Sequence, residues 1–249
     1  MKNKPIVHAY FICFNEEEIL PHLIKHYSTF CEKITIVDNN STDNSVSVAK
    51  SFDNVDVVTF NSNNEFNDGV QAMVKNQVWK TSVGTADYVI VGDSDEFLYH
   101  PNMIDFLIKS KKRNITIFKP NGYHMVADLD YYPNNDDNFL EKIQYGVKTP
   151  VLDKMMMFDC NKIKEINYSV GAHACNPVGE VNLYQADGLK MLHYKFLGIK
   201  LHLYKQKLRA DRLSDFNKKH GFTLYVLMSE NEHIEDYNSY FNKRKKVFG

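Results

Sequence analysis

Over the first hundred residues, short apolar runs alternate with segments that have the periodicity of a helix. The apolar runs are rich in β-forming residues and predict strands at 5–14, 33–37, 55–60 and 87–91. The segments between them predict helices at 16–30, at about 41–52 and at 67–82. This alternation is typical of an α/β fold, in which a mostly parallel central sheet has helices on both faces.

Polar residues follow these strands at the point where each strand ends. Ligands of open parallel sheets bind at the carboxyl ends of the strands, which meet at one edge. The polar residues at those ends are Asn15, Glu16, Asp38, Asn39, Asp93 and Asp95. The sequence therefore predicts that these residues share one pocket.

The rest of the chain is less regular. Strands are predicted at 114–119, 154–158 and 189–194, with an acidic, asparagine-rich loop at 128–138. From about residue 199 the sequence becomes helical and charged. With 249 residues, of which 43% are hydrophobic, the chain can bury one substantial core. We therefore expect one domain over residues 1–198 and a helical C-terminal extension over 199–249 that packs on it.

Charge and cysteine content exclude several classes of protein. The formal net charge is -1, so no overall positive field draws the chain to nucleic acid. None of the four cysteines is at two-residue spacing from another, which gives no zinc pattern and fits a reducing compartment. No signal-peptide core precedes the first strand, and no stretch approaches the roughly 20 apolar residues of a membrane span. We expect a cytoplasmic protein, with peripheral contact at the inner face of the membrane through residues 243–246 as an open alternative.

The most informative segment is the strand at 87–91 with the residues that follow it. Here an apolar strand delivers the carboxylates of Asp93 and Asp95 at alternate positions, just where the chain leaves the sheet. Oxygen ligands at this spacing suit a hard divalent cation such as Mg²⁺ or Mn²⁺. Such an ion can bridge and neutralise a departing diphosphate, so this segment points to chemistry on a diphosphate.

Three segments together resemble the nucleotide-binding half of a family-two-type glycosyltransferase with the GT-A fold. They are FICFNEE at 11–17, VDNNSTDNS at 37–45 and GDSDEF at 92–97. The Asp-Glu-Phe ending of the third resembles the bacterial surface-polysaccharide branch of that family. The resemblance implies an enzyme that transfers a sugar from a nucleotide-diphosphate sugar, with UDP as the default nucleotide, to an acceptor hydroxyl. It also implies inversion, a glycan or lipid-linked saccharide as acceptor, residues 1–100 as the nucleotide-binding half, and 101–198 as the half that completes the acceptor and metal sites.

The resemblance also assigns roles around the metal. Asp95 would ligate Mn²⁺ or Mg²⁺, while Asp93, a further candidate metal ligand, would face the ribose or sugar beside the ion. His193, in the segment LHYK, would complete the metal site, although a strand histidine bonded to the backbone remains the alternative. Lys154, in the segment DKMMM, would approach the donor diphosphate.

Further residues are expected to contact the donor. Asp38 would bind the nucleobase or ribose, although it could simply build the turn that follows its strand. On the helix before the acid pair, Asn76 is favoured over Gln71 and Lys75. The remaining donor-binding candidates are Phe14, Asn15, Glu16 and Ser94.

The catalytic base is not identified, because the Glu-Asp pair of many relatives is missing from the expected region. The candidates are Glu180, Asp128 and His173, with Asp130 and Asp187 as further ones. A base must reach the acceptor hydroxyl at hydrogen-bond distance, which sequence does not reveal.

Two other functions compete with glycosyl transfer. A nucleotidyltransferase acting on sugar phosphates also uses a nucleotide, a metal and a similar sheet. That class usually has a glycine-rich loop after its first strand, and residues 14–17 contain no glycine. The second alternative is a non-catalytic protein of the same fold that binds a carbohydrate or nucleotide.

Overall fold

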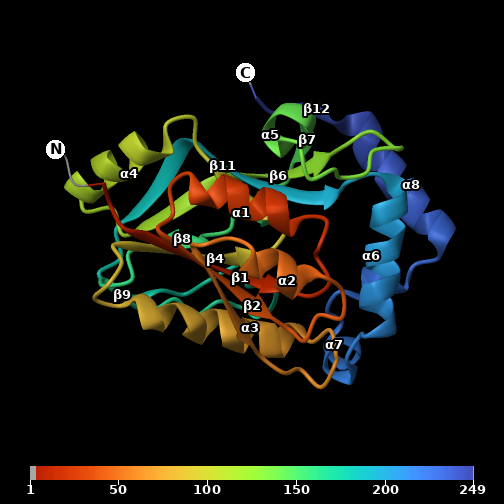
Figure 1. Cartoon of the computed structure of the whole chain (residues 1–249), viewed down its shortest axis with the longest axis horizontal. Coiled ribbons are helices and arrows are strands. Elements are labelled where there is room, and N and C mark those ends of the chain that lie inside the picture. The colour runs from red at the N-terminus through yellow and green to blue at the C-terminus, as the bar shows by residue number, and fades with distance from the viewer. Residues whose placement is uncertain (1–3, 249) are drawn as a thin grey trace.

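Four parallel strands form one half of the main sheet, in the order β4, β1, β2, β3 (Figure 1). Their bounds are β1 Val7–Cys13, β2 Lys33–Asp38, β3 Val55–Thr59 and β4 Tyr88–Asp93. The computed structural model describes residues 4–248, except for the side chains of 186 and 187. Along β1, Ala9 and Phe11 pack into one hydrophobic cluster and Tyr10 and Ile12 into another, because successive side chains point to opposite faces. Both faces of this parallel half are therefore covered.

Helices cover the two faces of the parallel strands, as the sequence predicted (Figure 1). The first cluster takes side chains from α1 (Leu20–Ser28), α2 (Ser45–Lys50) and α4 (Met103–Lys112). The second takes side chains from α3 (Asp68–Gln77) and the 3₁₀ turn η1 (Val78–Ser82). The prediction of an α/β fold with a large central sheet between helices is confirmed.

The second half of the sheet mixes strand directions. Its strands are β5 Glu96–Tyr99, β6 Ile117–Val126, β7 Tyr145–Lys148, β8 Met157–Phe158, β11 Leu183–Phe196 and β12 Lys245–Lys246. Short β8 joins the halves, since it pairs antiparallel with both β4 and β6. Long β11 runs parallel to β6 and antiparallel to β5. Around them lie α5 Phe139–Lys142, η2 Pro150–Leu152, η3 Val170–Ala172 and a small sheet of β9 Ile163–Glu165 with β10 Val178–Gly179.

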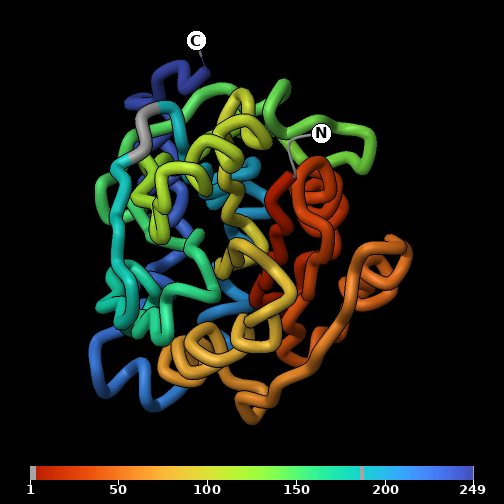
Figure 2. Tube along the Cα trace, turned by 90° about the vertical axis from the view of Figure 1, so that its left-hand side faces the viewer, coloured from red at the N-terminus to blue at the C-terminus, as the bar shows by residue number. Residues whose placement is uncertain are grey.

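After β11 the chain is mainly helical. The elements are α6 Ile199–Asp211, α7 Asp215–His220, η4 Leu224–Leu227 and α8 Glu230–Lys243. The segment after α6, blue in Figure 2, runs beside α3, and an isolated parallel bridge joins Phe66 to Leu213. The domain boundary at residue 198 stays a prediction. Within residues 4–248, none of the helices has both the length and the apolar character that a membrane span requires.

The predicted elements of the first hundred residues are all present, with bounds shifted by a few residues. The first helix begins at Leu20 rather than 16, because residues 16–19 form a turn in which the backbone N of Ile19 donates to the carbonyl oxygen of Glu16. Pro21 follows in the first turn of the helix, where proline is tolerated. The later strands differ more. β6 extends far beyond the predicted 114–119 and β11 beyond 189–194, whereas only the last two residues of 154–158 form a strand. In β6, Pro120 and Gly122 hide the strand pattern, since both residues are disfavoured within strands.

The hydroxyl of Tyr237 on α8 ties the C-terminal helices to the sheet. It accepts a hydrogen bond from the backbone N of Gly198 at 2.8 Å and donates toward the carbonyl oxygens of Ala127 and Phe196, both at 3.1 Å. We expect Tyr237→Phe to lower the free energy of unfolding by about 1–3 kcal/mol, because buried partners lose their hydrogen bond. Urea denaturation followed by circular dichroism measures this. Tyr240→Phe, also on α8, serves as the control, and an equal loss in both variants would contradict the role of the Tyr237 hydroxyl.

Candidate active site

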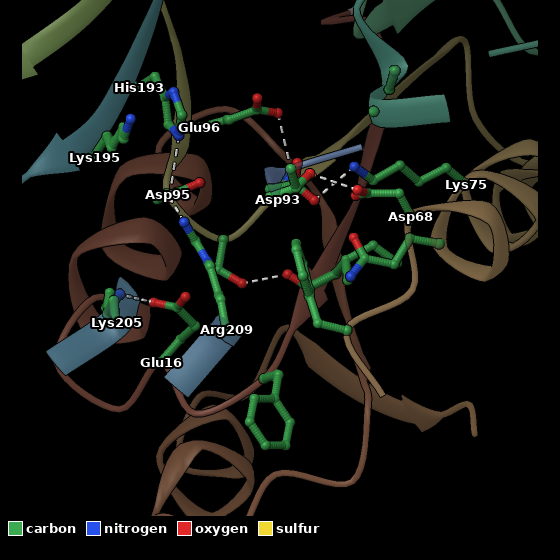
Figure 3. A pocket seen from close by; sticks show the side chains of 18 of the residues that line it. Glu16, Asp68, Lys75, Asp93, Asp95, Glu96, His193, Lys195, Lys205 and Arg209 are labelled. Carbon is green, nitrogen blue, oxygen red and sulfur yellow. Dashed lines mark hydrogen bonds and ion pairs between the residues drawn. The ribbon is translucent and has the colours of Figure 1, made fainter. Parts of the chain in front are cut away.

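A cavity of about 280 Å³ opens at the carboxyl ends of β1 and β4 (Figure 3). These strands are adjacent and parallel, so the residues that follow them lie side by side. The other walls come from α3, β6, β11, α6 and the segments around η2, η3 and η4. The pocket therefore lies at the sheet edge that the sequence predicted.

The two acids of the predicted pair enter this cavity from the end of β4. Between them, Ser94 anchors the turn to β1, because its hydroxyl donates to the carbonyl oxygen of Ile12 at 2.5 Å and its backbone N to the same oxygen at 3.2 Å. Asp95 is the more deeply buried of the two, with its side chain 6% exposed against 31% for Asp93.

Asp95 meets His193, which comes from a strand almost a hundred residues later. His193 pairs with Glu96 in the β11–β5 register, and the backbone N of Tyr194 donates to the carbonyl oxygen of Asp95 at 2.8 Å. This pairing leaves His193 Nε2 3.2 Å from Asp95 Oδ2. Burial alone would raise the pKa of Asp95, but His193, followed by Arg209, holds this pKa well below its usual value.

The Asp95–His193 pair fits a divalent cation. Two adjacent ligands, each about 2.1 Å from an octahedral ion, lie about 3 Å apart, close to the spacing seen here. Asp93 is directed elsewhere, because its Oδ1 pairs with Lys75 Nζ at 2.6 Å. Accordingly, no group of three or more histidines, cysteines or acids gathers as metal ligands in the part of the chain that the structure describes. An ion here would take its other ligands from a bound substrate or water.

Buried cations accompany the acids of the pocket. Lys154 Nζ lies 2.5 Å from Glu96 Oε1, Lys205 pairs with Glu16, and an Arg209 nitrogen lies 3.6 Å from Asp95. Burial opposes the charge of Lys154, but Glu96 and Asp93 raise its pKa above the usual value. Burial likewise opposes the charge of Asp93, yet Lys75 and then Lys154 lower its pKa. At neutral pH the pocket thus contains both a negatively charged Asp93 and a positively charged Lys154.

The turn after β1 forms the wall toward α2. Asn15 has a positive φ of 51°, and its side-chain oxygen accepts from the backbone N of Thr42 at 2.7 Å. Next to it, the Phe14 ring lies under the Arg212 guanidinium, 3.2 Å from the carbon to the ring centroid. Both Phe14 and Asn15 line the cavity. Asn15 therefore joins the two loops that follow β1 and β2.

Of the predicted donor and metal residues, most line the cavity. They are Phe14, Asn15, Glu16, Asp93, Ser94, Asp95, Lys154 and His193. Asp38 and Asn76 do not belong to its lining. Asp38 is buried and accepts from the backbone N of Ser41, so it builds the turn after β2. Asn76 bonds the backbone of Tyr168 through both side-chain atoms and fixes the segment before η3.

Among the base candidates with described side chains, only His173 lines the cavity. Glu180 pairs with Lys162 and Asp128 with Arg244, each at 2.9 Å, and Asp130 is not part of the lining either. The side chain of Asp187 lies outside the described residues.

The ring of His173 is held at one nitrogen by the backbone of η2. Its Nδ1 donates to the carbonyl oxygen of Val151 at 3.1 Å, which leaves the lone pair on Nε2. Burial, followed by the nearby charge of Lys154, lowers the pKa of His173 below its usual value. The ring is therefore neutral at neutral pH and able to accept a proton.

Sequence reasoning ranked Lys75 behind Asn76 and missed several other charged residues of the pocket. On α3, Asp68 and Lys75 line the cavity, and Asn76 lies about 100° further round the helix. Lys205 and Arg209 on α6, and Arg212 directly after its end, also line the cavity, although this segment was expected only to pack on the domain. Asp68 and Lys75 are seven positions apart, and Lys205, Arg209 and Arg212 are four and three apart, so a search for charged side chains on one helical face would have found them.

Comparisons with known proteins add a likeness in fold. No protein-family model matches the sequence, and no curated protein matches it. Among solved structures, S. aureus TarS matches with a TM-score of 0.49 and 11% identity, over 96% of this chain and 43% of that chain. Glucosyl-3-phosphoglycerate synthase from Mycobacterium tuberculosis, in complex with Mn²⁺, uridine diphosphate and glucosyl-3-phosphoglycerate, matches with a TM-score of 0.32 and 18% identity, over 48% and 44%.

A third match is mannosyl-3-phosphoglycerate synthase from Rubrobacter xylanophilus, with a TM-score of 0.33 and 16% identity, over 49% of this chain and 41% of that chain. The chain thus spans less than half the length of each of these three proteins. Likeness at this level carries no argument about chemistry, which has to come from the pocket's own residues.

The fit of Asp95 and His193 to a cation leads to a binding test. We expect Asp95→Asn to weaken Mn²⁺ binding, measured by calorimetric titration in the presence of UDP, by more than about 10-fold, because even the loss of an outer-shell partner costs 10-fold or more. Asp128→Asn, which alters a carboxylate outside the pocket, is the matched control. Thermal melts establish that both variants are folded. Equal Mn²⁺ affinity in the two variants would show that Asp95 is not a metal ligand.

Proposed function

We propose that the chain is a metal-dependent glycosyltransferase of the GT-A type, which transfers a sugar from a nucleotide-diphosphate sugar, preferably a UDP-sugar, to an acceptor hydroxyl. The observation that carries this proposal is the buried Asp95–His193 pair just beyond the end of β4, surrounded by buried lysine and arginine side chains. A carboxylate–imidazole pair suits a divalent ion. Cations around such a pair suit a ligand with several negative charges, such as a diphosphate.

The residues that would hold the ion are Asp95 and His193. When bound, Mn²⁺ or Mg²⁺ would supply positive charge that stabilises the leaving diphosphate. Lys75 already neutralises the charge of Asp93, so this carboxylate need not bind the ion. Asp93 would instead accept hydrogen bonds from the donor's ribose or sugar beside the ion. The other proposed donor contacts are Phe14, Asn15, Glu16 and Ser94, which line the same cavity.

Two cations of the chain would act on the leaving group. Lys154 is almost fully buried and held by Glu96, and Arg209 reaches Asp95 from α6. Charges fixed in a buried site interact strongly with developing negative charge, because no solvent has to reorganise around them. Lys154 and Arg209 would therefore favour cleavage of the bond between the sugar and the diphosphate.

His173 is the proposed base. As the acceptor oxygen bonds to the anomeric carbon, the bond from that carbon to the diphosphate breaks, and the acceptor's proton passes to His173 Nε2. Holding both substrates in one pocket removes part of the entropic barrier. A single displacement of this kind inverts the configuration at the anomeric carbon.

The setting of the reaction is also part of the proposal. We propose a glycan or lipid-linked saccharide as acceptor, in the synthesis of surface polysaccharide or another glycan in the cytoplasm. Peripheral contact with the inner face of the membrane would use Lys243, Lys245 and Lys246, which are exposed. Residues 1–100 would bind the nucleotide, and 101–198 would complete the metal and acceptor sites.

A donor screen tests the function directly. We expect purified protein to hydrolyse one nucleotide-diphosphate sugar slowly in the presence of Mn²⁺ and not after chelation, because water can replace the acceptor. The release of UDP or another nucleoside diphosphate from a panel of nucleotide sugars measures this. Release of pyrophosphate from a nucleoside triphosphate and a sugar phosphate would instead identify a nucleotidyltransferase, and binding without turnover would indicate a non-catalytic protein.

The role of His173 makes a second prediction. We expect His173→Gln to lower the rate of transfer by about 10²–10⁴-fold, the usual contribution of a general base, while UDP still binds. Because the pKa of His173 lies below 6.5, the wild-type rate should be constant above that pH and fall as the pH drops through the lowered pKa. Glu180→Gln is the control outside the pocket, and loss of transfer in that variant alone would assign the base to Glu180.

A further inference from the structure

The charged residues of the pocket do not balance. Its described lining contains six basic side chains, which are Lys75, Lys154, Lys195, Lys205, Arg209 and Arg212. Against them stand five acidic side chains, which are Glu16, Asp68, Asp93, Asp95 and Glu96. Counted formally, with the histidines left out, the cavity lining therefore has one more basic side chain than acidic ones. Because the charges of a divalent cation and a nucleotide-diphosphate sugar cancel, this excess would persist with donor and metal bound.

Two of these cations, Lys195 and Arg212, have no carboxylate within 3.6 Å among the described residues. The other four cations each have one. Arg212 is engaged differently, since it donates to the carbonyl oxygens of Asn64 and Glu65 and covers the Phe14 ring. The carboxylate nearest to Lys195 Nζ is Asp236, at 3.9 Å, which is beyond hydrogen-bond distance.

Lys195 is nevertheless well buried. Its side chain is 13% exposed, and its Nζ lies 4.6 Å from the ring centroid of Tyr225 and 4.9 Å from that of Phe196. Aromatic faces attract a cation, but they supply no hydrogen-bond acceptor as strong as an anion. A buried ammonium whose nearest anion is too far away for a hydrogen bond costs free energy. The position therefore favours a ligand that brings a negative charge.

The location of Lys195 separates it from the proposed donor contacts. It lies on β11, two residues beyond His193 and within the irregular stretch between His193 and Phe196 where the register with β6 shifts. Figure 3 shows it beside His193, on the side away from Lys75 and Asp68. Phe14 and Asn15, in contrast, follow β1. A group bound at Lys195 would thus lie on the side of the metal ligands that faces away from Asp93 and α3.

We propose that Lys195 binds a phosphate or carboxylate group of the acceptor, close to the hydroxyl that receives the sugar. The acceptor is then an anionic saccharide or polyol, and a neutral one would leave this charge unpaired. The identification of the bound anion as an acceptor rests on the proposed glycosyltransferase function. A lysine ammonium is a compact charge with three donors, which suits either kind of anion.

The test compares three ligands that share the same sugar ring: glucose, glucose 6-phosphate and glucuronate. Each is titrated calorimetrically into the protein saturated with Mn²⁺ and UDP, so that the donor's diphosphate site is already filled. We expect at least one anionic sugar to bind at least about 10-fold more tightly than glucose, because a hydrogen bond to a charged group contributes about 1.5–3 kcal/mol. Preference for the phosphate or for the carboxylate identifies which anion Lys195 takes.

Variants then locate the anion. We expect Lys195→Met to abolish the preference over glucose and Lys195→Arg to restore most of it, because methionine keeps the apolar stem and arginine keeps the charge. Lys200→Met is the matched control, since Lys200 lies five residues later on the surface of α6. Anions that bind no better than glucose would overturn the proposal, as would a preference that survives in Lys195→Met.

The two proposals fail in different ways. If UDP and Mn²⁺ do not bind to the wild-type protein, the glycosyltransferase function is wrong. Titration of inorganic phosphate into the protein without nucleotide still tests the anion site. Loss of phosphate binding in Lys195→Met but not in Lys200→Met would support that site, and equal binding in both variants would overturn it.

Discussion

The antiparallel pairing of β5 with β11 determines which side chains meet in the pocket. In this register Leu192 lies opposite Phe97 and His193 opposite Glu96. Because side chains alternate along a strand, a shift by one residue would turn His193 to the other face of the sheet. The same pairing continues through the hydrogen bond from Tyr194 to Asp95. The proposed metal ligands are thus positioned by backbone hydrogen bonds rather than by a mobile loop.

The acids and bases of the pocket depend on one another in turn. Removal of one partner from a buried ion pair leaves an unpaired charge, at a cost of about 3–5 kcal/mol. Lys154 with Glu96 is such a pair, and buried Lys75 pairs with the partly exposed Asp93. They hold the cavity's side chains in fixed positions before any ligand binds. Charges prepared in this way need little rearrangement when a diphosphate enters.

The sequence was sufficient for those features that depend on local pattern. Strand and helix periods located the parallel half of the sheet, and the acids after β4 lie in the pocket as expected. Features that depend on how the elements pack against one another could not be predicted from the sequence. Asn76 and Lys75 are neighbours on α3, and only the contact with Tyr168 shows that Asn76 supports η3 instead of facing the cavity. Likewise, the direction in which α6 presents Arg209 depends on how that helix docks.

The path of the chain around the cavity also affects how the protein is made. Glu16 is held by Lys205 and Asp68 by Thr223, partners that are 189 and 155 positions apart in the chain. Contacts between such distant residues form late in folding, because a long loop has to close first. During synthesis on the ribosome, the amino-terminal strands emerge well before α6 and η4 do. The pocket of a nascent chain is therefore incomplete. Glu16 and Asp68 stay without these partners until the last quarter of the sequence has been synthesised.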